Sequence, residues 1–310
     1  MSRSLRAFAP ATVANVACGF DVLGFAVENP GDEVILTLRE QPGIEICAIH
    51  GDGGQLPLDP QQNAVGVVIG EYLRFIDAEK QGVRVELFKN MPLKSGMGSS
   101  AASSAVGVFA INQLMGNPLE AAQLLPFAMA GEKLACGAAH ADNVAPALLG
   151  GFVLVRSYDP LDIVQLPMPD RLWCSLVHPH IEVQTRDARN ILRREIPLRD
   201  AVVQWGNLGG LVAGILTADY GLIGRSMQDV IIEPMRSLLI PGFHDAKQAA
   251  LEAGALGCSI SGSGPSMFAL STDGETAARI GEVMTAVFRS LEIDARAYIS
   301  KLSPRGPKVL

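Results

Sequence analysis

Alternating apolar and polar positions predict most of the strands in this chain. Residues 33–40 (EVILTLRE) and 83–88 (VRVELF) alternate with a period of two, as half-buried strands do. Residues 4–9 alternate more loosely and run into Pro10, so we expect a strand that ends in a loop there. The same pattern predicts strands over residues 152–157, 172–178 and 294–301, and a strand with a loop over 256–270.

Apolar residues at helical spacing predict the helices. From Asn63 to Phe75 they recur every three or four residues. From Ser99 a run of small residues predicts a helix that ends near Gly116, because an Asn-Pro pair follows. Residues 136–150 are rich in Ala and Gly and predict a tightly packed loop instead. Further helices are expected over residues 119–135, 187–195, 198–218, 243–254 and 275–291.

Prolines at positions 160, 167 and 169 predict a domain boundary. The boundary divides the chain into an N-terminal domain of residues 1–160 and a C-terminal domain of residues 165–310, in keeping with common domain sizes. The order of elements in the second domain favours an α+β fold of ferredoxin-like type. The residues after Pro304 are expected to form a loose end.

Composition excludes several classes of protein. Apolar residues make up 48% and charged residues 18% of the 310 residues, the balance of a globular chain. A net charge of −7 without a run of Lys or Arg argues against nucleic-acid binding. The chain has neither the apolar stretch of a membrane-spanning helix nor a secretory signal. Its five cysteines are scattered, so we expect free thiols in a cytoplasmic protein rather than disulfides or a zinc site.

The segment PLKSGMGSSAASS (92–104) joins a strand to a helix and carries the clearest chemistry. Its glycines allow backbone geometry that other residues avoid. Ser99 and Ser100 lie where the free N–H groups and the positive end of the helix would form an anion site suited to phosphate. Lys94 adds positive charge, and the Ser100 hydroxyl is placed to bind a phosphate-associated Mg²⁺.

This segment alone leaves other interpretations open. A serine-capped helix after an ordinary loop has the same appearance, because serine caps are common. Residues 96–101 also satisfy the dinucleotide pattern G-x-G-x-x-G/A, but the position of its acidic residue falls in a predicted helix, near Glu120. Gly-Lys-Ser/Thr, His-Arg-Asp and Asp-Phe-Gly do not occur, which excludes a Walker A loop and a protein kinase.

Five segments, in the same order, resemble the GHMP kinases, a superfamily that includes galactokinase, homoserine kinase, mevalonate kinase and phosphomevalonate kinase. Together they cover both predicted domains, and the first, third and fourth are similar to the homoserine kinases in particular. Met97 stands where the superfamily usually has Leu. The segments are APATVANVACGFDVLG (9–24), PLKSGMGSSAA (92–102), GEKLACGAAHADNVAPALLGGF (131–152), EPMRSLLIPGF (233–243) and SISGSGPSMFAL (259–270).

The resemblance implies a two-domain, α+β GHMP kinase fold. Its N-terminal domain would contain a left-handed βαβ unit, its C-terminal domain would be ferredoxin-like, and the active site would lie between them. The implied reaction is ATP-dependent phosphorylation of the side-chain hydroxyl of L-homoserine to O-phospho-L-homoserine, a step of threonine biosynthesis. A homodimer is common among such enzymes, although the sequence shows no interface signal.

The resemblance also assigns residues to ATP and Mg²⁺. Ser100 and Glu132 would bind the metal, which prefers hard oxygen ligands. Without the resemblance, a glutamate on a helix is more often a solvated surface charge. The implied ATP-binding residues are Pro92, Lys94, Ser95, Gly96, Gly98, Ser99, Ser100, Ala101, Ala102 and Asn63.

The acceptor is expected to be held by charge. Asp21 would bind the ammonium of an amino acid, and Arg189 and Arg236 would bind its carboxylate, because a guanidinium matches a carboxylate at two points. Charged residues of this kind are otherwise more often surface ion-pair partners, and glycines more often form a tight turn. The other implied substrate-binding residues are Asn15, His140, Asn143, Thr185, Gly262 and Gly264.

The resemblance further implies catalysis by Glu132, Ser100 and Asn143. Mevalonate-type relatives have an aspartate where this chain has Asn143, and an amide cannot accept a proton at neutral pH, so we expect no carboxylate general base. Two alternatives remain. A sugar or mevalonate kinase would make less use of Asp21 and the arginines, and a non-catalytic relative that binds small ligands should have lost Glu132 or the loop serines.

Overall fold

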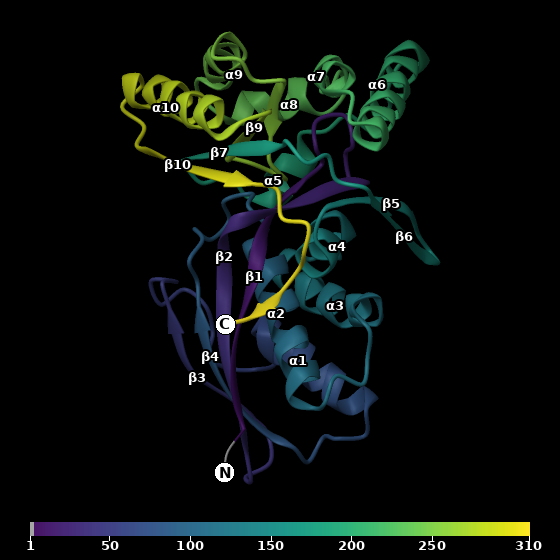
Figure 1. The fold of residues 1–310 in the computed structure, drawn as a ribbon. Coiled ribbons are helices and arrows are strands. Elements are labelled where there is room, and N and C mark those ends of the chain that lie inside the picture. The colour runs from purple at the N-terminus through teal and green to yellow at the C-terminus, as the bar shows by residue number, and fades with distance from the viewer. Residues whose placement is uncertain (1–2) are drawn as a thin grey trace.

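Two sheets organise the chain, of which the structure, a computed structural model, describes residues 3–310 (Figure 1). Within these residues the larger sheet has seven strands in the order β11-β1-β2-β4-β3, with β5 paired to β2 and β6 to β5. All pairs are antiparallel except β3 with β4. The strands are β1 (Ser4–Ala14), β2 (Leu23–Arg39), β3 (Ile44–His50), β4 (Gly82–Phe88), β5 (Phe152–Tyr158), β6 (Leu161–Leu166) and β11 (Lys308–Val309).

Helices α1 to α4 lie along one side of strands β1 and β2 (Figure 1). Helix α2 is the centre of this layer, since it packs against the sheet and against α1, α3 and α4. Its small side chains allow this close approach, and 13 of its 16 residues are buried, as expected of a helix enclosed on all sides. The helices are α1 (Ala64–Phe75), α2 (Ser99–Leu114), η1 (Ala121–Leu124), α3 (Leu125–Cys136) and α4 (Ala141–Leu149).

The smaller sheet confirms the ferredoxin-like second half. Its strands β7 (Trp173–Pro179), β8 (Gly257–Ile260), β9 (Met267–Ser271) and β10 (Ala295–Lys301) pair antiparallel in the order β10-β7-β9-β8. Helices follow β7, a hairpin joins β8 to β9, and α10 leads to β10, which is the βαββαβ order. The helices are α5 (Thr185–Asn190), α6 (Leu198–Thr217), α7 (Tyr220–Ser226), α8 (Glu233–Arg236), η2 (Ser237–Leu239), α9 (Phe243–Glu252) and α10 (Gly274–Ser290).

The predicted loop over 136–150 is wrong, because most of it forms helix α4. Buried residues recur in it at helical spacing, at Ala141, Val144, Ala145 and Leu148. Pro146 is tolerated within this short helix. Proline has no N–H, so it cannot donate to the Asp142 carbonyl oxygen. That oxygen lies against strand β2 instead, so close to Gly24 that a Cβ there would be 1.8 Å away.

The predicted loose end after Pro304 is also wrong. Strand β11 pairs with β1, with Ala7 opposite Val309 and Phe8 opposite Lys308. The N–H of Leu310 donates to the carbonyl of Arg6 at 2.9 Å. Figure 1 shows the yellow end of the chain returning along the larger sheet. Backbone hydrogen bonds, which a side-chain pattern does not report, hold this end in place.

The structure adds strands β3 and β6 and helices α7 and α8, none of which the hydrophobic pattern predicted. Strand β3, helix α1 and strand β4 form a parallel βαβ unit; its left-handedness stays a prediction. The division into residues 1–160 and 165–310 also stays a prediction, and we note that β6 pairs with the larger sheet. Among residues 3–310, no helix has the length and apolar character needed to span a membrane.

Candidate active site

A cavity of about 650 Å³ is lined by residues from both halves of the chain. It is lined by the first turns of α2 and α4, the end of α3, helix α5 and the loop at Gly262–Ser263. The volume is in the range of small-molecule and cofactor sites. Most of the predicted site residues line it, namely Asn15, Asp21, Asn63, Lys94, Ser95, Gly96, Gly98, Ser99, Ser100, Glu132, His140, Asn143, Thr185, Arg189, Arg236 and Gly262.

The glycine loop has the backbone geometry that its sequence predicted. Gly96 and Gly98 have φ of 80° and 68°, and Gly98 is the N-cap of α2. A Cβ on Gly98 would lie 2.0 Å from Oγ1 of Thr12, and one on Gly96 would lie 2.4 Å from the carbonyl oxygen of Ser261. Both positions therefore require glycine for conformation and for space.

Both halves of the chain hold this loop in place. The N–H of Thr12 in β1 donates to the carbonyl of Met97 at 3.1 Å. From the C-terminal half, Ser261 Oγ donates to the Gly96 carbonyl at 2.7 Å, and the N–H of Ser266 donates to the Ser95 carbonyl at 3.1 Å. The free N–H groups at the start of α2 are thus presented to the cavity on a fixed backbone, as an anion site requires.

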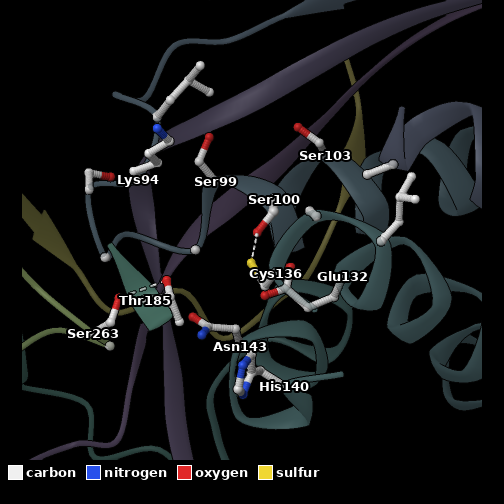
Figure 2. A pocket seen from close by; sticks show the side chains of 18 of the residues that line it. Lys94, Ser99, Ser100, Ser103, Glu132, Cys136, His140, Asn143, Thr185 and Ser263 are labelled. Atoms are coloured by element: carbon white, nitrogen blue, oxygen red, sulfur yellow. Dashed lines mark hydrogen bonds between the residues drawn. The ribbon is translucent and has the colours of Figure 1, made fainter. Parts of the chain in front are cut away.

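Glu132 is a buried carboxyl group beside the glycine loop. Its side chain is 3% exposed, and Oε2 has no hydrogen-bond partner within the described part of the chain. Burial raises the pKa of this carboxyl, while hydrogen bonds with Ser100 and Cys136 and the charge of Lys89 oppose the shift. A buried oxygen without a partner is costly unless a ligand satisfies it, so Glu132 and the adjacent Ser100 hydroxyl fit a bound cation (Figure 2).

Sequence analysis missed the ion pair beneath the glycine loop. The buried Lys89 ammonium donates to the Asp32 carboxylate, to the Ser99 carbonyl at 2.9 Å and to Ser103 Oγ at 2.6 Å. Asp32 also accepts hydrogen bonds from the Ser99 and Ser103 hydroxyls at 3.3 and 3.0 Å. The pair thus connects strand β2 and the residue after β4 to the first turn of α2. A lysine just after a strand carried no sequence signal for this role.

Asp21 and Arg189 neutralise each other at the opposite end of the cavity. Their two-point contact has distances of 2.8 and 3.1 Å. The Arg189 guanidinium also lies 3.2 Å from Nδ1 of His140. Burial and the charges of Arg189 and Arg236 lower the pKa of His140, although Asp21 opposes the shift. His140 is therefore neutral at neutral pH.

Arg236 is held differently from Arg189. It is 3% exposed and donates to the carbonyls of Ala188 and Gly262 at 3.1 and 2.9 Å. Its guanidinium carbon lies 5.0 Å from the ring centre of Phe20, a cation–π distance. Burial and the charge of Arg189 lower its pKa to about 10, which leaves it charged at neutral pH.

Asn15, Asp142 and Asn143 lie between the two ends. The amide of Asn15 donates to the Gly262 carbonyl at 2.7 Å and accepts from the N–H of Asp21 at 3.0 Å. The Asn143 oxygen accepts from the Thr12 hydroxyl at 2.8 Å, which fixes its amide. Asp142, which was not among the predicted site residues, is buried and lines the cavity. Burial and the charge of Asp21 raise its pKa to about 7.

The remaining predicted residues take less central places. Thr185 Oγ1 lies 3.3 Å from Oγ of Ser263 (Figure 2). Lys94 forms an exposed ion pair with Glu182 at 2.7 Å. Asn63 caps α1 by accepting from the N–H of Val65 at 3.0 Å. Four predicted residues lie outside the cavity lining, namely Pro92, Ala101, Ala102 and Gly264; the last three are buried.

The rim near Asn63 contains apolar residues that sequence analysis missed, namely Leu56, Pro57 and Leu134. Leu134 is 45% exposed. Leu56 and Pro57 lie in the loop before α1 and Leu134 lies in α3. They belong to no motif, so only the fold brings them together. Such a rim suits the flat face of a nucleotide base.

Comparison with known proteins places the chain in a family. The model of the GHMP kinase N-terminal domain matches residues 63–151, and that of the C-terminal domain matches residues 211–290. Homoserine kinases of Chlorobium phaeobacteroides (strain BS1) and Xylella fastidiosa (strain M12) are 54% and 39% identical to it, over 99% and 98% of this chain and 100% and 94% of theirs.

Solved structures agree with these relatives. A crystal structure of homoserine kinase from Cytophaga hutchinsonii is 62% identical and superposes with a TM-score of 0.97, covering 99% of this chain and 97% of that one. Mevalonate kinase of L. major, 15% identical with a TM-score of 0.73 over 95% of each chain, shares the fold alone. The protein described here therefore belongs to the homoserine kinase family of the GHMP kinases.

Proposed function

We propose that this protein transfers the γ-phosphoryl group of ATP to the side-chain hydroxyl of L-homoserine, giving ADP and O-phospho-L-homoserine. The observation that carries the proposal is a single cavity with a helix N-terminus for phosphate at one end and Asp21, Arg189 and Arg236 at the other. Relatives named homoserine kinase that align along the full chain support the same acceptor.

At the phosphate end, the glycine loop would hold the nucleotide. The N–H groups at the start of α2 are suited to phosphate oxygens, and the apolar rim at Leu56, Pro57 and Leu134 is suited to the base. Ser100 and Glu132 would bind Mg²⁺, which would neutralise charge that builds up on the phosphate oxygens during transfer. Lys89 and Asp32 keep the first turn of α2 at a fixed place beneath these groups.

At the acceptor end, the substrate would replace contacts that the protein now makes with itself. The carboxylate of homoserine would bind the Arg189 guanidinium, and its ammonium would bind the Asp21 carboxylate. The ion pair between Asp21 and Arg189 would therefore separate. Arg236 is already fixed by two carbonyls and would supply the second guanidinium. An acceptor that carries only one of the two charges would replace one partner of the pair and leave the other unsatisfied, which is a strong source of selectivity.

The acceptor hydroxyl would be oriented rather than deprotonated by a base. Asn143 is fixed by Thr12 and cannot accept a proton. A loose transition state needs little activation of the nucleophile, so the proton can leave late, to the transferred phosphoryl group. His140 is neutral and lies against Arg189, where it supports the position of the guanidinium.

Two finer points are also proposals. We assign the protein to the cytoplasm because all five of its cysteines are free, as is usual in a reducing compartment. The homodimer expected from the resemblance stays a prediction.

An acceptor panel tests the function. ADP release would be followed with Mg²⁺-ATP and L-homoserine, the amino alcohol lacking its carboxylate, the hydroxy acid lacking its ammonium, a hexose and mevalonate. We expect the highest kcat/KM with L-homoserine and a drop of roughly tenfold or more for each missing charge. Faster turnover of a sugar or of mevalonate would refute the proposed acceptor.

A further inference from the structure

Glu132 and Cys136 stand one turn apart on the last turns of α3. Side chains four positions apart lie on the same face of a helix, the spacing that also brings two metal ligands together in other proteins. Helix α3 ends immediately afterwards at Gly137, whose φ is 77°. Both side chains line the cavity beside the glycine loop.

A third potential ligand comes from a different helix. The hydroxyl of Ser100, in the first turn of α2, lies 3.5 Å from the Cys136 sulfur. Figure 2 shows this contact as a dashed line, with the Glu132 carboxylate beside it. Oε2 of Glu132 is buried and has no hydrogen-bond partner within the described residues. A buried carboxylate oxygen of this kind indicates a cation.

The thiol changes which cation the group prefers. Mg²⁺ takes hard oxygen ligands and gains little from sulfur. Zn²⁺ and its analogue Cd²⁺ bind thiolate and carboxylate together, and an incomplete set of protein ligands leaves positions open for water or phosphate oxygen. We propose that Glu132, Cys136 and Ser100 form a site for a thiophilic divalent cation, Zn²⁺ or Cd²⁺, which competes with Mg²⁺ in the cavity.

Binding has two consequences. The thiol proton is released to solvent as the sulfur binds the metal as thiolate. The cation then occupies Glu132 and Ser100, so Mg²⁺ cannot use them and phosphoryl transfer slows. The second consequence rests on the proposed kinase function, whereas the binding itself does not.

Cadmium titration tests the site directly. Protein in thiol-free buffer would be titrated with Cd²⁺, with and without ADP, while the ultraviolet sulfur-to-cadmium charge-transfer band is recorded. We expect one Cd²⁺ per chain in the wild type. In Cys136→Ser the band should disappear. In Glu132→Gln the band should need at least about tenfold more Cd²⁺, the lower bound for losing even an outer partner of a metal.

Cys47→Ser is the matched control, because Cys47 lies in strand β3 and donates to the Val85 carbonyl, outside the cavity lining. This variant should keep the band unchanged. A band that survives in Cys136→Ser and Cys136→Ala, or a wild type without a band at saturating Cd²⁺, would overturn the site. A wild type that binds Cd²⁺ through Cys136 but does not phosphorylate homoserine with Mg²⁺ would refute the proposed function and support this site.

Discussion

The two ends of the cavity prepare for their ligands in opposite ways. At the phosphate end, the glycine loop is fixed by hydrogen bonds from both halves of the chain, and Oε2 of Glu132 has no hydrogen-bond partner among residues 3–310. At the acceptor end, Asp21 and Arg189 form an ion pair with each other, while Arg189 Nε and Asp142 Oδ1 are buried without a hydrogen-bond partner within residues 3–310. The phosphate end is therefore built in advance, whereas the acceptor end must exchange an internal ion pair for substrate.

This difference separates the tasks of the two ends. A preformed anion site stabilises transferred charge without rearrangement, which favours rate. An exchanged ion pair favours selectivity, because a ligand that replaces one partner leaves the other charge unpaired. We therefore expect changes at the phosphate end to act on stability and turnover, and changes at the acceptor end to act on substrate affinity.

The largest effect is expected beneath the glycine loop. Lys89→Met leaves the Asp32 carboxylate buried and unpaired, which should lower the free energy of unfolding by about 3–5 kcal/mol. Denaturant unfolding measures this loss, and the double variant Lys89→Met/Asp32→Leu should recover part of it. A loss below about 1 kcal/mol, as for an exposed ion pair, would show that the pair does not hold α2.

Glu132→Gln should come next, with kcat reduced by about 10²–10³ at moderate Mg²⁺. The amide keeps the shape of the side chain but loses the negative charge that would balance the charge of the metal ion. ADP binding without metal should stay unchanged, as titration calorimetry can show. Glu282→Gln, on the exposed face of α10, is the control. Near-normal kcat in Glu132→Gln would remove this residue from the metal site.

Smaller effects are expected for the guanidinium groups. Arg189→Ala and Arg236→Ala should each raise KM for homoserine about ten- to a hundredfold, the equivalent of roughly 1.5–3 kcal/mol, with KM for ATP nearly unchanged. The exposed Arg193 provides the control variant Arg193→Ala. If both site variants bind homoserine normally, the carboxylate contact is wrong and the contrast between the two ends fails.

The smallest effects should follow His140→Gln and Asn143→Ala, because loss of an orienting contact lowers the rate by less than the roughly 10²–10⁴-fold of a lost general base.

The pKa of Asp142 is raised to about 7, so this carboxyl ionises as pH rises through 7 and becomes able to assist Asp21 in binding ammonium. The kcat/KM for homoserine should rise over that range.

His140 should not produce this rise, because its pKa is lowered and it is already neutral there. The rise in kcat/KM should persist in His140→Gln and disappear in Asp142→Asn. If the pH profile of kcat has a limb near pH 6–7, and His140→Gln abolishes that limb together with most of the activity, His140 is instead the base.

Local patterns predicted the elements that local physics determines. The alternation of residues 33–40 and 83–88 and the small residues after Ser99 correspond to strands β2 and β4 and helix α2. The sequence could identify the glycines of the loop as essential to its geometry, because positive φ and close packing exclude other residue types at these positions. Asp21, Arg189 and Arg236 could be chosen only by resemblance, since nothing in their spacing brings them to one cavity.

The remainder depends on tertiary structure. Pro146 and the glycines that flank α4 concealed its helical spacing, because proline usually ends a helix. Strand β11 is held by backbone pairing to β1, which leaves no side-chain signal. Lys89 and Asp32 are 57 positions apart and meet only when β2 and the end of β4 lie beside α2.

Identification of the phosphorylated product tests the central claim most directly. Purified protein would be incubated with Mg²⁺-ATP and L-homoserine, and the fate of the γ-phosphoryl group would be followed by phosphorus NMR. The account predicts one phosphate monoester on the homoserine side-chain oxygen for each ADP formed. ADP accompanied only by inorganic phosphate, or phosphorylation of another alcohol in preference to homoserine, would contradict it.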